Sequence, residues 1–277
     1  MSTDDHPRRF CLLSTDIENY SGFDNDRQVT AQKQLRDILD RAARQAGVAR
    51  ERWTTQANGD GELALVPGDV SEAALVSDFV RELDDELSRY NRDRVREARL
   101  RLRLAVHHGL AVIGENGFPG VDVVHVARLV DADEVRTALR DDRHANLVVV
   151  VSDRLYGDIV VQRYRGLRPE EFTRIIVDRP AKGFTAVAWV RVPGRVIGVF
   201  WIATGHGREA KLVCVPDGEP AYAGVSELAE LPDHLLAEIA NFFDVYRMLD
   251  PDSFTSCDGY EGAAAAAEVL RAARTPA

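Results

Sequence analysis

Two aspartates, Asp16 and Asp60, stand in sequence surroundings that could bring them together. Asp16 follows the short apolar run Phe10–Leu13, and Asp60 lies between two glycines in the stretch QANGDGELAL. A tight turn accounts for the glycines but not for an acid at its tip. Two carboxylates held close together are typical ligands of divalent cations, which can activate a hydroxyl and neutralise a triphosphate. The alternative is that Asp16 caps a helix and Asp60 only makes a turn.

The elements predicted around these residues alternate between strands and helices. Helical spacing of apolar residues predicts helices over Arg27–Ala46, Val70–Tyr90 and His125–Arg140. Strands are predicted at Phe10–Leu13, at Trp53–Thr55 and Glu62–Val66 around the ANGDG turn, and in ARLRLRLAVHHGLAVI, NLVVVVSD, FTRIIV and TAVAWVRV. The alternation within ARLRLRLAVHHGLAVI predicts a strand with one exposed face. The element order predicts an α+β sandwich, an antiparallel sheet with helices packed on it.

The composition changes near Gly194, and the sequence predicts a domain boundary there, between 1–193 and 194–277. Beyond it, VIGVFWI and AKLVCVP are predicted strands, and LPDHLLAEIANFFDVYRML is a predicted helix with proline in its first turn. A second, alanine-rich helix is predicted over Tyr260–Arg274. The second domain is therefore expected to be a small β/α module.

Charge and composition exclude several classes of function. The 277 residues carry a formal net charge of −10, which argues against nucleic acid as the main partner. No stretch approaches the ~20 uninterrupted apolar residues of a membrane span, and MSTDDHPRRF lacks the apolar core of a secretory signal. We therefore expect a cytoplasmic protein without a membrane partner. Cys11, Cys214 and Cys257 form no CxxC pair, so neither a disulfide framework nor a zinc site is predicted.

Over roughly residues 10–192 the sequence resembles the catalytic domain of class III nucleotidyl cyclases, a ferredoxin-like sandwich. LLSTDIENYSGF resembles the family's first metal-binding strand, and NGDGELALV resembles the second, a hairpin with glycine before aspartate. RLAVHHG resembles its arginine-x-glycine-isoleucine-histidine strand, with Ala105 in place of the glycine. GVDVVHVARLVDA resembles the helical segment that follows. The four motifs occur in the family's order.

The resemblance implies a set of site residues. Asp16 and Asp60, with the carbonyl of Ile17, would hold two divalent cations, Mg²⁺ or Mn²⁺. The loop Glu18, Asn19, Tyr20, Ser21 and Gly22 would offer N–H groups to the phosphates of a nucleoside triphosphate. Arg128 would stabilise charge on the transferring phosphoryl group; the alternative is a solvated helix arginine. The family forms head-to-tail homodimers in which the aspartates and the arginine come from different chains.

Two positions depart from the purine cyclases of the family. Gln56 stands where they carry a base-reading lysine, and Val124 stands where they carry a ribose-orienting asparagine. One interpretation is a catalytically inactive nucleotide-binding or regulatory module. The other is a cyclase that recognises a different nucleotide base, because both aspartates and Arg128 are kept. The second pattern resembles the pyrimidine cyclases of bacterial anti-phage defence, which convert UTP or CTP to a cyclic monophosphate for a separate effector protein.

The segment 195–273 resembles the C-terminal part of family I inorganic pyrophosphatases, through GREAKLVCVP, LPDHLLAEIANFFDVYRML and GYEGAAAAAEVL. Lys211 and Tyr246 match that family, whereas Thr204, Glu209 and Arg247 replace expected residues. The family's acidic metal-binding strands belong to its N-terminal half, which has no counterpart here. The tail is therefore expected to be a structural or interaction module without hydrolytic activity, with pyrophosphatase as the third candidate function. A segment that corresponds to only half of a barrel leaves open sheet edges, and these edges should pack on the cyclase-like domain or on a partner.

Overall fold

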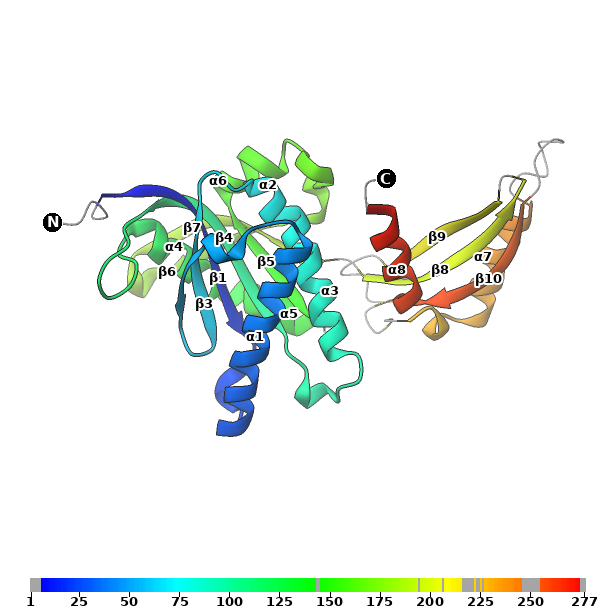
Figure 1. Cartoon of the computed structure of the whole chain (residues 1–277), viewed down its shortest axis with the longest axis horizontal. Helices are drawn as coiled ribbons and strands as arrows, with labels where there is room; N and C mark the ends of the chain where they lie inside the picture. The colour runs from blue at the N-terminus through cyan, green and yellow to red at the C-terminus, as the bar shows by residue number, and fades with distance from the viewer. Residues whose placement is uncertain are drawn as a thin grey trace. The chain divides into compact units, whose positions relative to one another are not determined.

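The computed structural model describes residues 6–142, 145–193, 195–205, 207–215, 222, 225, 227–245 and 255–274. Residues 1–141 and 145–193 form a first compact unit, and the residues from 194 onward belong to a second (Figure 1). The two units are considered separately below.

A seven-stranded sheet forms the centre of the first unit, with the strand order β2-β3-β1-β4-β5-β7-β6. The strands are β1 (Arg8–Ile17), β2 (Thr54–Ala57), β3 (Gly61–Pro67), β4 (Leu102–Ala111), β5 (Leu147–Ser152), β6 (Thr173–Arg179) and β7 (Phe184–Arg191). Every neighbouring pair is antiparallel except β4 and β5, which are parallel. The central position of β1 places the end of that strand between β3 and β4.

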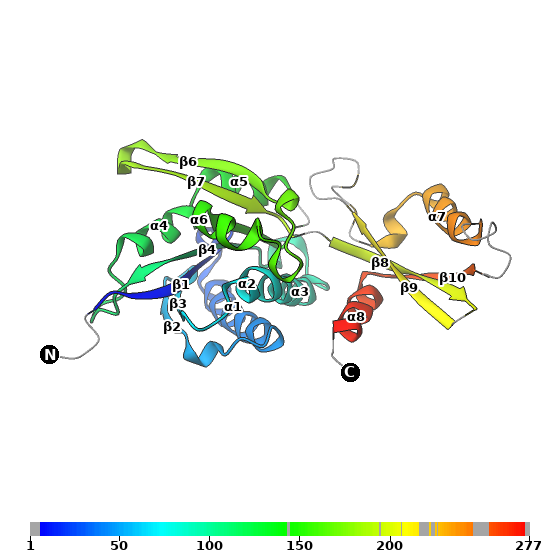
Figure 2. The same ribbon diagram turned by 90° about the horizontal axis from the view of Figure 1, so that it is seen from above.

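Helices cover both faces of this sheet (Figure 2). One face carries α1 (Asn25–Gln45), α2 (Glu72–Ala74), the π-helical turn Leu75–Phe79, α3 (Val80–Asn91) and the short α6 (Asp153–Leu155). The other carries α4 (Val121–Val130) and α5 (Asp133–Asp141). Alternate side chains of β1 enter the two cores, since Leu13 packs with α1 and Leu12 packs with α4. The α+β sandwich predicted from the sequence is confirmed.

Two details of the prediction for this unit are wrong. Every residue of β4 except Leu110 is buried, because helices cover both faces of the sheet at this strand. Its polar side chains are therefore buried too, including Arg103 and His107. The helix predicted over 125–140 is two helices, because α4 ends at Val130 and the acidic residues Asp133 and Glu134 begin α5.

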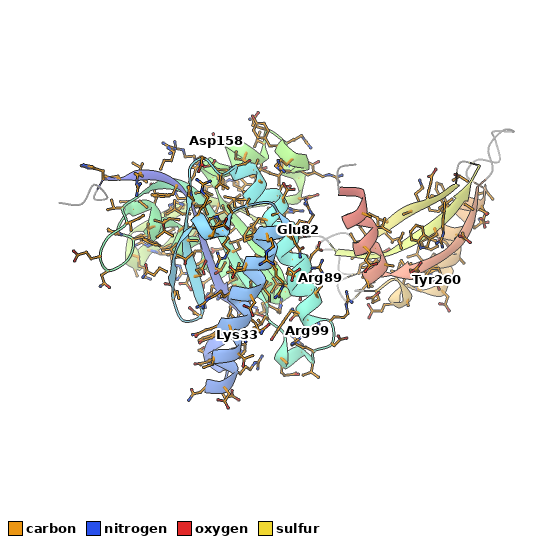
Figure 3. The ribbon with its side chains drawn as sticks, in the orientation of Figure 1. Lys33, Glu82, Arg89, Arg99, Asp158 and Tyr260 are labelled. Carbon is orange, nitrogen blue, oxygen red and sulfur yellow. The ribbon has the colours of Figure 1, made fainter. Side chains whose placement is uncertain are left out.

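The second unit is a three-stranded antiparallel sheet with the order β10-β8-β9. It contains β8 (Arg195–Thr204), β9 (Gly207–Val215), α7 (Asp233–Val245), β10 (Thr255–Gly262) and α8 (Ala263–Arg274). The helix predicted from Tyr260 begins only at Ala263, because residues 260–262 pair with β8 as the end of β10. The Tyr260 ring contacts Phe200 and stays about half exposed, at 49% (Figure 3).

Candidate active site

Glycine is needed on each side of Asp60 for a different structural reason. Gly59 has a φ of +82°, a conformation that favours glycine, and the turn closes through a hydrogen bond of 2.9 Å from the Asn58 N–H to the Gly61 carbonyl. Gly61 lies so close to β1 that a Cβ atom would stand 1.8 Å from the Thr15 carbonyl oxygen. The first glycine makes the turn and the second lets the hairpin lie against β1.

The backbone pairing of this hairpin brings Asp16, Ile17 and Asp60 together. Asp16 stands opposite Gly61 in the β1–β3 register, and the Ile17 N–H donates a 2.8 Å hydrogen bond to the Asp60 carbonyl. The Asp60 carboxylate makes no hydrogen bond or ion pair with any of the residues that the structure describes. Three predicted ligands thus lie at one end of the sheet.

The Asp16 carboxylate has a charged neighbour that the sequence did not indicate. Arg103 stands opposite Asp16 in the β1–β4 register, and its Nη2 atom contacts Asp16 Oδ2. The contact is an ion pair without an aligned hydrogen bond, and Asp16 Oδ2 is buried. Burial and the charge of Arg136, opposed by Asp131, lower the pKa of Arg103 to about 10.

Oxygen donors of this kind suit Mg²⁺ or Mn²⁺. Asp16 Oδ2 is buried and paired with Arg103, which leaves the other carboxylate oxygen of Asp16 to a cation, and the Asp60 carboxylate makes no hydrogen bond or ion pair among the described residues. No group of three or more His, Cys, Asp or Glu side chains suited to a metal occurs within the described part of the chain. The two carboxylates match the donor type that such a cation prefers, and its remaining ligands would be water, a backbone carbonyl or a bound phosphate.

The loop after Asp16 is tied to its surroundings. The Glu18 N–H donates to the Arg101 carbonyl at 2.9 Å, and the Glu18 carboxylate accepts from Arg101 Nη1 at 2.8 Å. Asn19 adopts a left-handed conformation, and its carbonyl accepts from the Gly22 N–H. A phosphate could therefore use the Glu18 N–H only by replacing a hydrogen bond already made. Ser21 lies in the same turn, at the surface.

Sequence reasoning missed a glutamine that joins the two ligand-bearing segments. Gln32 of α1 donates through Nε2 to the Tyr20 hydroxyl at 2.7 Å and to the Gly59 carbonyl at 2.8 Å. One amide group thus ties the loop after Asp16 to the hairpin turn before Asp60. Gln32 is exposed, so hydrophobic periodicity gave no signal for this role.

Gln56 lines a hollow of about 540 Å³. Its side-chain amide lies against Gly117, where a Cβ atom would stand 2.7 Å from Gln56 Oε1. The other lining residues are Asn58, Leu63, Gly114, Glu115, Asn116, Phe118, Pro119 and Val123. Gln56 therefore faces a concave surface formed with the segment 114–119.

Arg128 lies apart from the two aspartates, and no contact joins it to them among the described residues. Its Cζ atom is 4.9 Å from the centre of the Phe184 ring, within cation–π distance. Phe184 in turn meets His125, whose ring stacks on His107 with the centroids 4.5 Å apart. Burial, aided by the nearby charges of His107 and Arg128, lowers the pKa of His125 to about 4. The histidine beside Arg128 is therefore neutral at physiological pH.

Asp122 fixes the start of α4, the helix that carries Arg128. Its carboxylate accepts a 2.6 Å hydrogen bond from the Leu110 N–H and lies 3.2 Å from His107 Nε2. It also fills the space beside Gly109, where a Cβ atom would stand 2.2 Å from the carboxyl carbon. The glycine in RLAVHHG is thus explained by the close approach of Asp122.

The tail residues singled out in the sequence form a smaller polar group. Lys211 Nζ pairs with Glu209 Oε2 at 2.7 Å, and the Thr204 hydroxyl donates to the Gly207 carbonyl at 2.9 Å. Tyr246 and Arg247 lie outside the described residues. These side chains are half-buried, on β8 and β9.

The first unit has the fold of the class III nucleotidyl cyclase catalytic domain. It resembles the crystal structure of a protein described as an adenylate/guanylate cyclase/hydrolase from Silicibacter pomeroyi, with a TM-score of 0.50 and 22% identity. The match covers 68% of this chain and 98% of that one. The cyclase resemblance seen in the sequence is thereby confirmed at the level of fold.

The C-terminal part is similar to inorganic pyrophosphatases. The family model described as inorganic pyrophosphatase matches residues 183–276. The inorganic pyrophosphatase of Methanosarcina acetivorans is 36% identical over 88 residues, which are 30% of this chain and 52% of that protein. That of Yersinia pestis is 39% identical over 79 residues, 27% and 45% of the two chains. The chain thus spans about half the length of these curated relatives.

Of the helices that the structure describes, not one combines the length and the apolar character that crossing a bilayer takes.

Proposed function

We propose that the first unit is a metal-dependent nucleotidyl cyclase, which converts a nucleoside triphosphate to its 3′,5′-cyclic monophosphate and diphosphate. One observation carries the proposal: the backbone pairing of the Asp60 hairpin with β1. It brings Asp16 and Asp60 to the same end of the sheet, on backbone segments that are hydrogen-bonded to one another.

The residues of this site have distinct roles in the proposal. Asp16, Asp60 and the Ile17 carbonyl would hold two divalent cations, Mn²⁺ or Mg²⁺. Bound there, such ions lower the pKa of the ribose 3′-hydroxyl and offset the charge of the triphosphate. N–H groups of the loop from Glu18 to Ser21 would hold the phosphates.

The proposed enzyme is a homodimer. The Arg128 guanidinium makes no contact with the aspartates of its own chain among the described residues, so in the proposal it serves the other copy. Exposed apolar side chains support pairing at this helix, because Leu110, Val121 and Val124 lie around the first turns of α4 at 48%, 86% and 46% exposure. An apolar group of this kind at a surface is typical of an interaction site.

We propose a pyrimidine nucleotide, UTP or CTP, as the substrate. The hollow at Gln56 supports a base site, and an amide that both donates and accepts can pair with the edge of uracil or cytosine. The proposed setting is the cytoplasm, in anti-phage defence, where a separate effector protein responds to the cyclic product. The second unit is proposed as a structural or interaction module.

The direct test incubates the full chain with Mn²⁺ and each of the four ribonucleoside triphosphates. We expect a cyclic monophosphate from UTP or CTP, and none from the Asp60→Ala variant. Asp69→Ala is a matched control, because Asp69 also follows a glycine in a turn, at the other end of β3, and pairs with Arg52 at the surface. Cyclic product that survives Asp60→Ala would refute the site. Tight triphosphate binding without turnover would favour the inactive binding module instead.

Mixing two inactive variants tests the dimer. Asp60→Ala and Arg128→Ala should each be inactive, but a dimer of one with the other keeps one intact site. Random exchange of subunits makes half of the dimers mixed, so we expect about a quarter of the wild-type activity after mixing. A mixture as inactive as its components would contradict the shared site.

A further inference from the structure

The sheet of the second unit has two outer strands, β9 and β10, and among the described residues each pairs only with β8. The outer side of such a strand carries backbone N–H and C=O groups that can pair with a further strand. β10 is irregular, because its pairing with β8 shifts between Cys257 and Tyr260. In β9, by contrast, every residue from Gly207 to Leu212 has its partner in β8 in unbroken succession. β9 is therefore the edge that suits a further strand.

The charges along β9 are complementary to those of a second β9. Glu209 and Lys211 lie on one face of the strand, and their charged groups pair at 2.7 Å. An antiparallel pair of β9 strands centred on Ala210 would set Glu209 of each copy opposite Lys211 of the other, which is a favourable cross-strand pair. Centring the pair on Glu209 would set two glutamates opposite one another, and centring it on Lys211 would set two lysines opposite one another. The charges thus select one register among these three.

The middle of β9 is only partly covered within a single copy. The residues from Glu209 to Val213 are all half-buried, and Leu212 and Val213 among them are apolar. A further strand along β9 would remove part of this apolar surface from water. The match to the Methanosarcina acetivorans pyrophosphatase covers 52% of that protein, which therefore has nearly as many residues again beyond the match. A second copy of this chain is the occupant that fits, because it brings the same edge, the complementary charges and a comparable number of residues.

We propose that β9 is an interface between two copies of this chain, in which the two strands pair antiparallel about Ala210 and join two three-stranded sheets into one continuous sheet. The contact is self-complementary, since each copy offers the same residues and a twofold axis passes beside Ala210. It is separate from the pairing at α4, which belongs to the first unit, and it does not depend on cyclase activity.

Disulfide formation at the centre of the interface tests this pairing in the full chain. Residues directly opposite one another in an antiparallel pair have Cα atoms about 4.5–5.5 Å apart, which a disulfide can span. In a Cys214→Ser background, Ala210→Cys should therefore form a cross-linked dimer under a mild oxidant, seen on a non-reducing gel. Arg208→Cys in the same background is the matched control, because the substituted positions of the two copies would lie about 13 Å apart along the strands. A yield for Ala210→Cys no higher than for Arg208→Cys would overturn the interface.

Charge reversal within the Ala210→Cys chain tests the register. Glu209→Lys or Lys211→Glu alone would set like charges opposite one another at two places, and should lower the initial rate of cross-linking by about fivefold or more. The two reversals together restore the opposite pairs and should return the rate to near that of the parent. A double variant as slow as the single ones would overturn the register. Adding Asp60→Ala should leave the cross-linking rate unchanged, so this interface and the proposed cyclase activity stand or fall separately.

Discussion

Replacing Gly61 by alanine should open the hairpin that carries Asp60. The new Cβ atom would stand 1.8 Å from the Thr15 carbonyl oxygen and 3.1 Å from the Asp16 Cα atom, both in the backbone. A carbon and an oxygen rarely approach closer than about 3.3 Å, so the two strands must separate by roughly 1.5 Å. No side-chain rotation relieves the clash.

The energetic cost follows from the contacts that this separation breaks. The hydrogen bond from the Ile17 N–H to the Asp60 carbonyl (2.8 Å) and that from the Glu62 N–H to the Thr15 hydroxyl (3.0 Å) would both lengthen. At ~1 kcal/mol for each bond, and ~1–3 kcal/mol for overpacking, Gly61→Ala should lower the free energy of unfolding by about 3–5 kcal/mol.

Urea unfolding followed by tryptophan fluorescence measures this difference. A Trp201→Phe background leaves Trp53 and Trp189, both in the first unit, as reporters. With an m-value of ~2–3 kcal/mol/M, the midpoint should fall by roughly 1–2.5 M. Gly157→Ala is the matched control, because a Cβ atom there meets nothing within 4 Å, and its midpoint should stay or rise slightly. Equal midpoints for the Gly61 variant and the wild type would refute the close approach of β1 and β3.

Three further predictions concern residues around the site. Gln32→Ala should speed amide hydrogen exchange at the turn that contains Gly59. It should lower the free energy of unfolding by less than ~1 kcal/mol, because the side chain is exposed. Unchanged exchange would contradict the hydrogen bond from Gln32 to the Gly59 carbonyl. Phe184→Leu should lower kcat for cyclisation while Mn²⁺ binding stays intact, since it removes the cation–π contact with Arg128 together with the edge-on contact with His125. An equal kcat would show that the ring does not position the guanidinium. Because the pKa of His125 is about 4 when folded and near 6.5 when unfolded, stability should be full above pH 6.5 and fall from there towards pH 4. His125→Phe, compared with the wild type by urea unfolding at several pH values, should lose less stability between pH 6.5 and pH 4. An equal loss in the two proteins would exclude His125 as its cause.

Local patterns sufficed to predict how Asp16 and Asp60 come together. A strand end and a glycine-flanked hairpin are encoded by neighbouring residues, and pairing of the two strands then follows from the sandwich. Arg103 could not be placed in this way. Its strand alternates like one with a solvated face, and only the packing of α4 and α5, encoded elsewhere in the chain, buries that face.

Other parts of the site depend on contacts between distant segments that carry no periodic signal. Gln32 is an exposed residue on a helix, so nothing in its own surroundings indicated a bond to Gly59. The stacking of His125 on His107 depends on the crossing of α4 over β4. The hollow at Gln56 is completed by the loop 114–119, whose shape no helix or strand pattern predicts.

The place of β7 in the sheet restricts how the chain can be divided. The pyrophosphatase match starts at residue 183, yet β7 (Phe184–Arg191) lies between β5 and β6 and pairs with both. A cut at the start of that match would strip β6 of the neighbour that joins it to the sheet and would expose the edge of β5. Expression of either half alone, or an exchange of tails between relatives, should therefore use a junction after Pro193, which severs no strand pairing among the described residues.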